Sequence, residues 1–423
     1  MRNIRDYEAW SAQGLDWTGA FARAIGDMRR EGGGVLQVPP GVYPTGPIRL
    51  YDDMTLCVES GAVLRFHDDP AAFPRVELEF EGVAGELPHP CLWAAGARNV
   101  TVTGFGTLDG QGAAWWRRHR AGENPNGRPY LVCFSDCEQV TLENVTLTNS
   151  PAWTVHPLRC RKVTLRGLSI LNPADSPNTD GIDPDSCQDV RISDCTIDVG
   201  DDCIAIKSGT EQTANRQPSE RILITNCHFL HGHGGGVLGS EMSGDIRNVA
   251  VSSCVFYQTD RGVRLKTRRG RGGTVEGIQL NNLVMEEVMC PFVFNMYYFC
   301  GADGKLRRVW DKAPQPVDST TPALRDVSIS GVRARRCTAC AGFFYGLAEM
   351  PVEGVTLRDV TVEMTPDGPA GYPAMMDGCP EMRAAGFFLR NARGVDLRGV
   401  RVKGVSGAWL DVDDSVHLEG QET

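Results

Sequence analysis

The chain has 423 residues, of which 41% are hydrophobic and 23% are charged, and its formal net charge at pH 7 is −10. This acidic balance argues against a general nucleic-acid binder, because phosphate binding needs clustered Lys and Arg over much of a surface. No apolar run approaches the length of a membrane span, and the first residues lack the charged-then-apolar pattern of a signal peptide. We therefore expect a cytoplasmic protein with no nucleic-acid or membrane partner, or a secreted one if a leader precedes this sequence.

The sequence contains 15 cysteines. An odd number without the spacing of a small disulfide scaffold indicates reduced, buried thiols. No Cys/His cluster of the zinc-binding kind stands out either. We therefore expect neither a metal nor a cofactor, and reduced thiols agree with a cytoplasmic location.

The first predicted element is a helix over about residues 16–32. Its apolar residues have helical spacing, and three consecutive glycines that begin at Gly32 end it. A stack of strands leaves an unpaired edge at each end, which invites aggregation unless it is covered. We expect this helix to cap the N-terminal end of the stack of strands that follows.

From about residue 100 onward the chain repeats one pattern: an alternating apolar stretch, a small or polar residue, and a second alternating stretch. Copies begin at Val100, Val140, Val163, Val190, Ile222, Val249, Ile278, Val327, Val355 and Val395. Each copy predicts two short strands joined by a turn, and successive copies lie roughly 23 to 32 residues apart where no loop intervenes.

One such copy cannot bury its own apolar face, so the copies must stack into a continuous core. A leucine-rich repeat would carry a helical segment in each copy, and a β-propeller would need four strands in each. A rung of about three short strands fits the period best. We therefore predict an all-β fold, a single right-handed parallel β-helix domain over residues 1–423 with the N-terminal capping helix.

The repeat also indicates the location of residues for which we predict no chemical role. Three cysteines fall in the slot that apolar residues fill in other copies: Cys195, Cys227 and Cys254. We expect these three to be core residues. Charges, prolines and a Trp interrupt the repeat over about residues 297–322, which predicts a long inserted loop. Tyr297 or Tyr298 is a candidate for contact with a sugar there.

Reactive side chains concentrate in the turns between the later strands. They form four groups, namely Asn178-Thr179-Asp180, Asp201-Asp202, Gly232-His233-Gly234, and Arg264 with Lys266. Counted from Gln188 and Glu220, two residues before the copies at Val190 and Ile222, Asp201 and His233 each come thirteen residues later. Because neighbouring rungs are about 4.8 Å apart, equal offsets bring these two side chains together on one face. Asp180 comes one rung earlier, and Arg264 with Lys266 one rung later.

This set of residues predicts acid–base chemistry on an acidic substrate. Carboxylates this close cannot all ionise cheaply, which provides a general acid beside a general base, as glycoside hydrolysis requires. Arg264 and Lys266 alternate on a strand, so both point the same way, and Arg can bind a carboxylate in bidentate fashion. Asp and Asn at turns often only cap the backbone, but four groups in order on consecutive rungs favour a site. Asp183 and Asp185 alternate on a strand and are candidates for supporting the site, while Lys207 is given no role.

The four groups resemble glycoside hydrolase family 28, the polygalacturonases and their relatives, whose pattern is Asn-Thr-Asp, Asp-Asp, Gly-His-Gly and Arg-x-Lys. The stretches that begin at Gly104 and at Asn149 are similar as well, and the likeness runs from about Asp16 onward. The resemblance implies an inverting hydrolase, without cofactor, that cleaves α-1,4 linkages between galacturonic acid residues of pectin-derived oligosaccharides.

The resemblance also implies catalytic roles. Asp201 would be the general acid that protonates the glycosidic oxygen. Asp180 and Asp202 would hold and activate the attacking water, and His233 would support Asp201. An inverting enzyme keeps its acid and base roughly 6.5 to 9.5 Å apart to leave room for that water.

Substrate binding would fall to Asn178, Arg264 and Lys266, of which the last two match the pair that binds a galacturonate carboxylate near the scissile bond. Relatives that act on rhamnogalacturonan tend to lack this pair, which favours a homogalacturonan-type substrate. Family members that attack polymeric pectin are commonly secreted. A cytoplasmic enzyme meets only imported oligosaccharides, which favours exo-cleavage of short oligogalacturonides.

Three alternatives stay open from the sequence. The first is a pectate lyase-like enzyme, in which the aspartates bind Ca²⁺ and Arg264 or Lys266 is the base of a β-elimination. The second is a non-catalytic solenoid that binds carbohydrate. The third keeps the hydrolytic mechanism on a rhamnogalacturonan or xylogalacturonan backbone.

Overall fold

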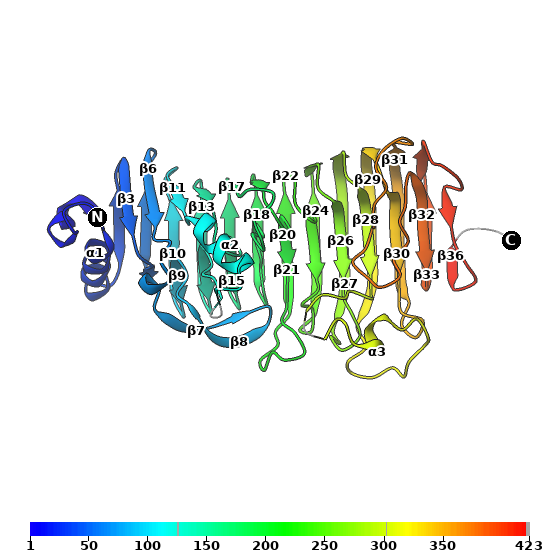
Figure 1. The fold of residues 1–423 in the computed structure, drawn as a ribbon, viewed down its shortest axis with the longest axis horizontal. Coiled ribbons are helices and arrows are strands. Elements are labelled where there is room, and N and C mark those ends of the chain that lie inside the picture. Colours follow the sequence, from blue (N-terminus) through cyan, green and yellow to red (C-terminus); the bar gives the residue numbers. More distant parts are fainter. Residues whose placement is uncertain (125–126, 302, 420–423) are drawn as a thin grey trace. The chain divides into compact units, whose positions relative to one another are not determined.

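The computed structural model describes residues 1–124, 127–301 and 303–419. Nearly all regular structure in these ranges is β-strand, and apart from one hairpin and two isolated bridges the strands pair in parallel, as the sequence predicts. The chain forms two compact units, residues 1–201 (unit 1) and 202–423 (unit 2). Figure 1 shows the strands of each unit stacked side by side. The prediction of one domain over the whole chain stays a prediction.

Unit 1 is built from rungs of three short parallel strands that form three stacks. The first stack contains β2 (Gly34–Val38), β5 (Met54–Val58), β10 (Arg98–Thr103), β13 (Glu138–Glu143), β16 (Arg161–Arg166) and β18 (Gln188–Ser193), with β1 (Arg2–Asn3) at its edge. The second contains β3 (Gly41–Thr45), β6 (Ala62–Phe66), β11 (Thr107–Asp109), β14 (Thr146–Thr148), β17 (Ser169–Leu171) and β19 (Thr196–Asp198). The third sheet of unit 1 contains β4 (Ile48–Leu50), β9 (Leu92–Ala95), β12 (Val132–Ser135) and β15 (Val155–Leu158).

The small or polar slot of the repeat is the sharp turn between the first two strands of a rung. Asn144, Gly167 and Asp194 occupy it on successive rungs with φ angles of 58°, 62° and 59°. Asn, Asp and Gly tolerate this left-handed backbone better than other residues do. The apolar residues on either side of the turn alternate inward, which explains why a period-2 pattern flanks one polar position.

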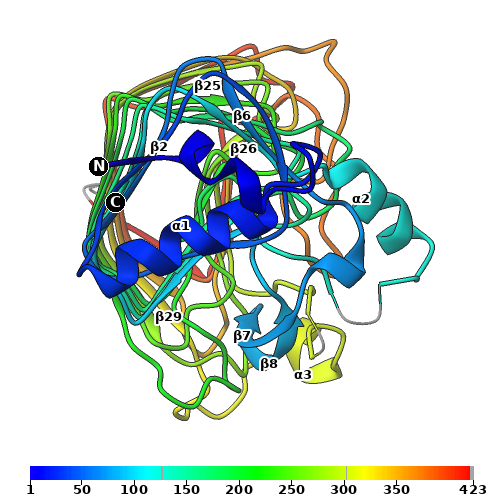
Figure 2. The same cartoon turned by 90° about the vertical axis from the view of Figure 1, so that its left-hand side faces the viewer.

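The N-terminal helix caps unit 1. Helix α1 (Thr18–Arg30) lies across the end of the coil and buries Phe21, Ile25 and Met28 among other apolar residues. Figure 2, which looks along the coil, shows it covering that end, beside the 3-10 helix Ile4–Trp10. The sequence therefore predicted this helix correctly, to within two residues at each end.

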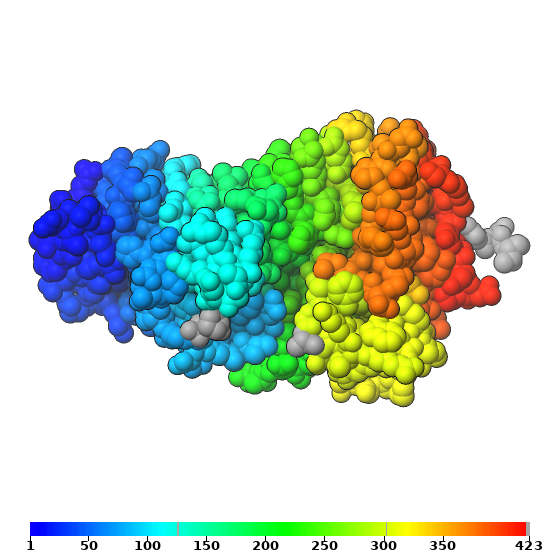
Figure 3. Space-filling view, in the orientation of Figure 1, coloured from blue at the N-terminus to red at the C-terminus, as the bar shows by residue number. Residues whose placement is uncertain are grey.

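Two further elements of unit 1 were not predicted from the sequence. Strands β7 (Arg75–Phe80) and β8 (Val83–Pro88) form an antiparallel hairpin, and α2 (Gly112–Arg120) is a short helix. Both stand out from the coil, α2 in cyan and the hairpin in blue (Figure 3). Neither element belongs to the repeat, so the repeat pattern gives no signal for them.

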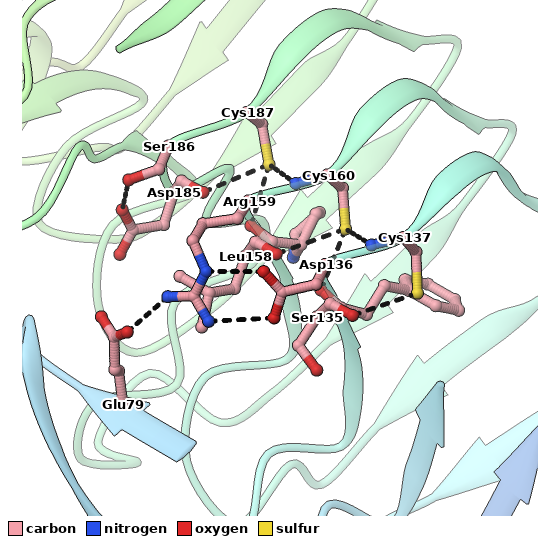
Figure 4. A network of polar contacts seen from close by, with 12 residues as sticks. Glu79, Ser135, Asp136, Cys137, Leu158, Arg159, Cys160, Asp185, Ser186 and Cys187 are labelled. Atoms are coloured by element: carbon pink, nitrogen blue, oxygen red, sulfur yellow. Dashed lines mark hydrogen bonds and ion pairs between the residues drawn. The ribbon is translucent and has the colours of Figure 1, made fainter. Parts of the chain in front are cut away.

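A ladder of cysteine thiols fastens three rungs of unit 1 (Figure 4). The backbone N–H of Cys137 donates to Sγ of Cys160 at 3.4 Å, and that of Cys160 donates to Sγ of Cys187 at 3.3 Å. Sγ of Cys160 donates to the carbonyl of Phe134, and Sγ of Cys187 to that of Pro157, both at 3.2 Å. Each thiol therefore satisfies two backbone groups of the preceding rung.

Unit 2 continues the same architecture with longer strands. Its third sheet contains β20 (Ile204–Ile206), β23 (Gly236–Gly239), β26 (Arg261–Lys266), β28 (Cys290–Asn295), β30 (Cys340–Tyr345), β32 (Ala385–Arg390) and β35 (Leu410–Asp411). Its other strands are β21 (Ser219–Thr225), β22 (His228–Leu230), β24 (Ile246–Ser252), β25 (Val255–Tyr257), β27 (Thr274–Glu286), β29 (Ala323–Cys337), β31 (Val352–Met364), β33 (Ala392–Arg398), β34 (Arg401–Lys403) and β36 (Val416–Glu419).

The predicted loop over 297–322 lies between β28 and β29, and its regular structure in the described residues is the short helix α3 (Arg307–Trp310). Arg269 holds it: its guanidinium donates to both carboxylate oxygens of Glu349 and to the carbonyl oxygens of Arg308 and Asp311. These bonds fix the loop, shown in yellow in Figure 3, to the body of unit 2.

The cysteines that the repeat assigned to the core are buried. Cys195, Cys227 and Cys254 are each at most 1% exposed, so their interpretation as core residues is confirmed. All 15 cysteines are free thiols, and the majority of them are buried. None of the helices in the described ranges is long and apolar enough to cross a lipid bilayer.

Candidate active site

The predicted site residues fall on both sides of the boundary between the units. Asn178, Asp180 and Asp201 belong to unit 1, and Asp202, His233, Arg264 and Lys266 belong to unit 2. The boundary coincides with the peptide bond between Asp201 and Asp202.

In unit 1, Asp180 sits directly before a continuation of the third sheet. Its carbonyl accepts a hydrogen bond from the N–H of Thr154 at 2.9 Å, and Ile182 forms a parallel bridge with Val155 of β15. The turn that leads to it starts at Asn178, whose φ of 52° suits an Asn. Asp180 is 4% exposed, so the carboxylate lies in a largely desolvated position.

The second carboxylate of this half, Asp201, is brought to the first by a glycine. A Cβ on Gly200 would lie 2.3 Å from the carbonyl oxygen of Ser176, so only glycine allows the chain to pass this close to the turn before Asp180. The N–H of Gly200 donates to Oγ1 of Thr179. As a result a carboxylate oxygen of Asp201 lies within 4.8 Å of one of Asp180. The predicted proximity of these two aspartates is therefore present in unit 1.

Arg128, which the sequence analysis missed, clamps this half of the site. Its guanidinium donates to the carbonyl oxygens of Pro151 and Pro177 at 3.0 and 2.6 Å, and to Oδ1 of Asn178 at 2.6 Å. Burial lowers the pKa of Arg128 to about 10, against the opposing charges of Asp180, Glu81 and Asp201. A lone Arg in a loop outside the repeat gives no sequence signal for this role.

In unit 2, Asp202 is buried between two cations. Nζ of Lys266 is 2.7 Å from Oδ2, and Nη1 of Arg264 is 3.6 Å from Oδ1, while Asp202 is 1% exposed. Burial alone would raise the pKa of this carboxyl. The charges of Lys266 and Arg264 outweigh burial and hold the pKa of Asp202 well below its usual range. These two cations therefore favour the ionised form of Asp202.

The glycines of the Gly-His-Gly group are required by close approaches in unit 2. A Cβ on Gly234 would lie 3.0 Å from Oδ1 of Asp202, and one on Gly235 would lie 2.3 Å from the ring of Phe256. The chain can therefore pass directly over the Asp202 carboxylate. His233 precedes this passage and its side chain is exposed to solvent. The predicted support of Asp201 by His233 remains a prediction.

Arg264 keeps a donor available in this half. Within the described part of the chain its Nη2 is buried and makes no hydrogen bond. The ring of Tyr298 lies 5.4 Å from its guanidinium carbon and 5.1 Å from Nζ of Lys266. Tyr298, one of the two tyrosines proposed for sugar contact, thus borders the cation pair, and burial raises its pKa well above the ordinary value.

The residues left to supporting roles are buried. Asp183 and Asp185 extend the third sheet of unit 1 by donating their N–H groups to the carbonyls of Val155 and Pro157. Oδ2 of Asp185 lies 3.8 Å from Nε2 of His156. In unit 2, Lys207 lies 3.6 Å from a carboxylate oxygen of Glu241, a residue the sequence analysis did not single out.

Unit 1 supplies two neighbouring carboxylates, and unit 2 supplies a carboxylate with a lowered pKa, two cations and a guanidinium donor without a hydrogen bond in the described residues. A pair of carboxylates in different environments is what acid–base cleavage of a glycosidic bond needs. The cations suit a carboxylate on the substrate. The coil and these residues define the class of parallel β-helix glycoside hydrolases.

Comparison with known proteins agrees with that class. The model of the family Glycosyl hydrolases family 28 matches residues 76–372. A protein of Vitis vinifera described as a probable polygalacturonase is 33% identical over 364 residues, which cover 82% of this chain and 71% of that one. The structure of a hyperthermoactive exopolygalacturonase from Thermotoga maritima has a TM-score of 0.77 and 29% identity, and covers 96% of this chain and 92% of its own.

A family 28 exopolygalacturonase from Yersinia enterocolitica shares the fold, with a TM-score of 0.78, 20% identity, and coverage of 98% of this chain and 76% of that one. The chain belongs to glycosyl hydrolase family 28, the polygalacturonase family, and its fold is the right-handed parallel β-helix. It is a glycoside hydrolase, so the alternative of a non-catalytic solenoid is set aside.

Proposed function

We propose that the chain is an exo-acting, inverting hydrolase that releases galacturonic acid from α-1,4-linked oligogalacturonides. The observation that carries this proposal is the Asp202 carboxylate, which Lys266 and Arg264 keep ionised. The similarity to exopolygalacturonases of known structure supports the same conclusion.

The charge environment of Asp202 decides its role. A general acid must hold a proton at the working pH, and Asp202 cannot, because its pKa is held well below the usual range. Asp202 therefore acts as a base toward water. We assign the role of the acid to Asp201, which is partly exposed and has a carboxylate oxygen within 4.8 Å of one of Asp180.

The proposed reaction follows from these assignments. Asp201 gives its proton to the glycosidic oxygen, and a water molecule attacks the anomeric carbon on the opposite face. The bond between the anomeric carbon and the glycosidic oxygen breaks, and Asp180 with Asp202 takes the proton of the water. One attack on the opposite face inverts the configuration at the anomeric carbon.

The acidic nature of the substrate rests on Arg264 and Lys266. A substrate carboxylate near them can accept a hydrogen bond from Nη2 of Arg264 and is attracted by two positive charges. The ring of Tyr298 borders the same place. A neutral sugar offers this donor only an uncharged hydroxyl oxygen, and a hydrogen bond between two charged groups is the stronger one, about 1.5–3 kcal/mol. This difference favours galacturonate over neutral hexoses.

Exo action is supported by the β7–β8 hairpin. Leu78 of the hairpin is buried against Trp93 of β9, Cys133 of β12 and Trp153, and the hydroxyl of Tyr130 donates to the carbonyl of Glu79 at 2.6 Å. The hairpin thus covers the outer face of the third sheet of unit 1. Only one more rung of that sheet follows before Asp180, so a polymer cannot continue far along unit 1.

A salt bridge fastens the hairpin in that position. Arg159 forms an ion pair with Glu79 of β7, and its Nε and Nη2 bind the two carboxylate oxygens of Asp136 at 2.7 and 3.0 Å (Figure 4). Arg159 is held between the two acids, and its pKa is raised above the ordinary value, first through Asp136. The covering element is therefore a fixed part of unit 1.

The elimination alternative is disfavoured by the same charges. A calcium ion at Asp202 would lie beside Lys266 and Arg264, both of which already neutralise that carboxylate. A lysine held at 2.7 Å from a carboxylate is also poorly suited to remove a proton from the substrate.

Product analysis tests the proposal. The enzyme is incubated with oligogalacturonides of two to six units, and the products are followed by anion-exchange chromatography and proton NMR. We expect monomer and shortened oligomers in single steps, with inverted configuration at the new reducing end. A spread of intermediate sizes contradicts exo action, and an unsaturated product that absorbs in the ultraviolet and disappears with chelator contradicts hydrolysis. Asp201→Asn is the inactive control.

We also propose a cytoplasmic location, supported by the 15 free thiols, since secreted proteins tend to pair their cysteines. Cell fractionation with an antibody against the protein tests this. Activity confined to the culture medium would overturn it.

A further inference from the structure

Two arginines near the N-terminal end of unit 1 carry charges that no carboxylate neutralises. Arg29 lies in the last turn of α1, Arg49 is the middle residue of β4, and both side chains are exposed. In the part of the chain that the structure describes, neither guanidinium group forms an ion pair or a hydrogen bond, and both contact aromatic rings. The negative end of a helix dipole favours a cation at Arg29, but no such effect acts on the strand residue Arg49.

Acidic residues of the same region have other partners. Asp27 lies 3.3 Å from Arg23 and also pairs with Arg30. The carboxylate of Asp52 accepts a hydrogen bond from the backbone N–H of Arg98. In a chain with 53 acidic and 43 basic side chains, an exposed pair of cations without an acid beside it is therefore a local exception. Such a pair attracts an anion.

Tyr51 brings the two guanidinium groups together. The centre of its ring lies 4.2 Å from the guanidinium carbon of Arg29 and 5.3 Å from that of Arg49. Arg49 also lies 4.6 Å from the ring of Trp93. Contact with an aromatic ring holds a guanidinium group in place without using its N–H donors in hydrogen bonds. Both arginines are therefore positioned and still have donors for a ligand.

A pocket of about 230 Å³ lies beside these groups. Its lining includes three buried apolar residues and three residues with polar groups, namely Phe21, Ile25, Ile48, Arg29, Arg49 and Tyr51. Pockets for drug-sized ligands have about 300–1,000 Å³, so this one suits a single sugar unit. An apolar wall with a tyrosine fits the ring of a sugar, and two guanidinium groups fit a carboxylate on it.

The pocket is separate from the catalytic residues of unit 1. Strand β4 is the edge strand of the third sheet, whose order is β15-β12-β9-β4, and Ile182 continues that sheet beyond β15. Four steps of about 4.8 Å, or about 19 Å, therefore separate β4 from the rung that follows Asp180. Leu78 of the β7–β8 hairpin is packed over Trp93 and Cys133 in between. A sugar unit in the pocket cannot touch Asp180.

We propose that Arg29, Arg49 and Tyr51 form a second binding site, which takes one galacturonate unit of an acidic oligosaccharide. The two arginines bind the carboxylate, and Tyr51 contacts the sugar ring. The choice of this anion rests on the proposed function, because a hydrolase of galacturonan meets it as substrate. The site concentrates oligosaccharide at the enzyme and takes no part in bond cleavage.

Hydrogen–deuterium exchange with mass spectrometry maps the site in the Asp201→Asn protein, which does not consume the ligand. The probes are tetragalacturonate, a neutral galactotetraose and sodium sulfate at equal ionic strength. We expect tetragalacturonate to protect peptides that cover residues 22–30 and 47–53, besides those around Asp180. The other two probes should leave residues 22–30 and 47–53 unprotected. Protection confined to the peptides around Asp180, or equal protection of residues 22–30 and 47–53 by the neutral sugar or by sulfate, would overturn the inference.

Variants in the same Asp201→Asn background test the two arginines. Arg29→Met and Arg49→Met should each weaken the binding that protects residues 22–30 and 47–53 about tenfold or more, because each loses a hydrogen bond between charged groups. Protection around Asp180 should persist. Arg98→Met is the matched control, since Arg98 is also exposed in unit 1 but pairs with Glu138 at 2.7 Å. It should leave the protection at both places unchanged.

Thermal unfolding of each variant separates binding from structure. Arg49→Lys keeps the charge and should retain more of the binding than Arg49→Met. A loss of protection that follows a lowered Tm and is not recovered in Arg49→Lys would show a structural role and overturn the inference. A wild-type protein that cleaves no oligogalacturonide would overturn the proposed function instead, and the exchange measurement on the inactive protein tells the two failures apart.

Discussion

The two halves of the candidate site treat their carboxylates in opposite ways. In unit 1, carboxylate oxygens of Asp180 and Asp201 lie within 4.8 Å of one another. The buried cation near them, Arg128, donates its hydrogen bonds to Asn178 and to two carbonyl groups. In unit 2, the single carboxylate of Asp202 has Lys266 and Arg264 in direct contact.

This difference shows how one chain can obtain an acid and a base from the same residue type. Contact with cations favours the ionised form of a carboxyl group, and this holds for Asp202. The two consecutive residues Asp201 and Asp202 therefore have different neighbours: Asp201 lies beside the carboxylate of Asp180, and Asp202 contacts Lys266 and Arg264. The sequence neighbours differ in role because their partners come from different rungs.

The largest expected effect comes from removing the two aspartates one at a time. Asp201→Asn and Asp202→Asn should each lower kcat by about 10³-fold or more, since each removes one proton-transfer group. Only Asp202→Asn should also destabilise the fold, by about 3–5 kcal/mol, because it leaves Lys266 and Arg264 buried without their counter-charge. Steady-state kinetics and urea unfolding measure the two effects. Equal stability of the two variants would contradict the view that only Asp202 neutralises buried cations.

A smaller effect is expected at the cation pair. Lys266→Met should raise KM for trigalacturonate about 100-fold, because a hydrogen bond to a charged group and part of the charge complementarity are lost. The variant should discriminate less between the free acid and its methyl ester. Kinetics on both substrates check this. If the kcat/KM for the acid divided by that for the ester keeps its wild-type value, Lys266 and Arg264 do not bind the substrate carboxylate.

The clamp of unit 1 should respond more weakly. Arg128→Met removes three hydrogen bonds, two of them to the turn before Asp180, and we expect kcat to fall about tenfold to 100-fold with a stability loss of about 1–3 kcal/mol. Arg120→Met is the matched control, since Arg120 is exposed and binds Asp175. Both variants are compared by kinetics and thermal unfolding, and equal behaviour would remove Arg128 from the site.

The smallest effect concerns pH and lies in the cation-rich unit. Nζ of Lys312 lies 3.5 Å above the ring of Tyr297, and burial lowers its pKa from the ordinary value to about 8. Because the folded state binds this proton less tightly than the unfolded chain, stability increases as pH rises from about 8 toward the unfolded value near 10.5.

Calorimetry at pH 7.5 and 9.5 measures this. Relative to Lys312→Met, the wild-type Tm should rise by about 1–3 °C between the two pH values. The variant has no proton to lose at this position. Parallel changes of Tm in the two proteins would show that another group titrates.

The sequence was informative wherever the repeat governs the chain. The period and the polar slot occupied by Asn144, Gly167 and Asp194 predicted the stacked parallel strands, because a left-handed turn restricts the residue types that can fill it. The order of the motifs predicted that Asp180 approaches Asp201 and that Lys266 lies on the cation-bearing strand of unit 2. Register alone fixes such neighbours.

The sequence was uninformative where function rests on loops. The β7–β8 hairpin and Arg128 are each placed by contacts between segments far apart in the chain, and neither of them repeats. A single Arg in a turn is usually a solvated surface residue. Their importance follows from burial and partners, which only the folded chain reveals.

The cysteine ladder of unit 1 has a consequence for how such a coil can change in length. The thiols of Cys160 and Cys187 make the same pair of bonds to the rung before them, one accepted from a backbone N–H and one donated to a carbonyl oxygen. An inserted rung that carries a cysteine in the same slot can make the same pair of bonds. The length of the coil can therefore change by whole rungs without loss of these contacts.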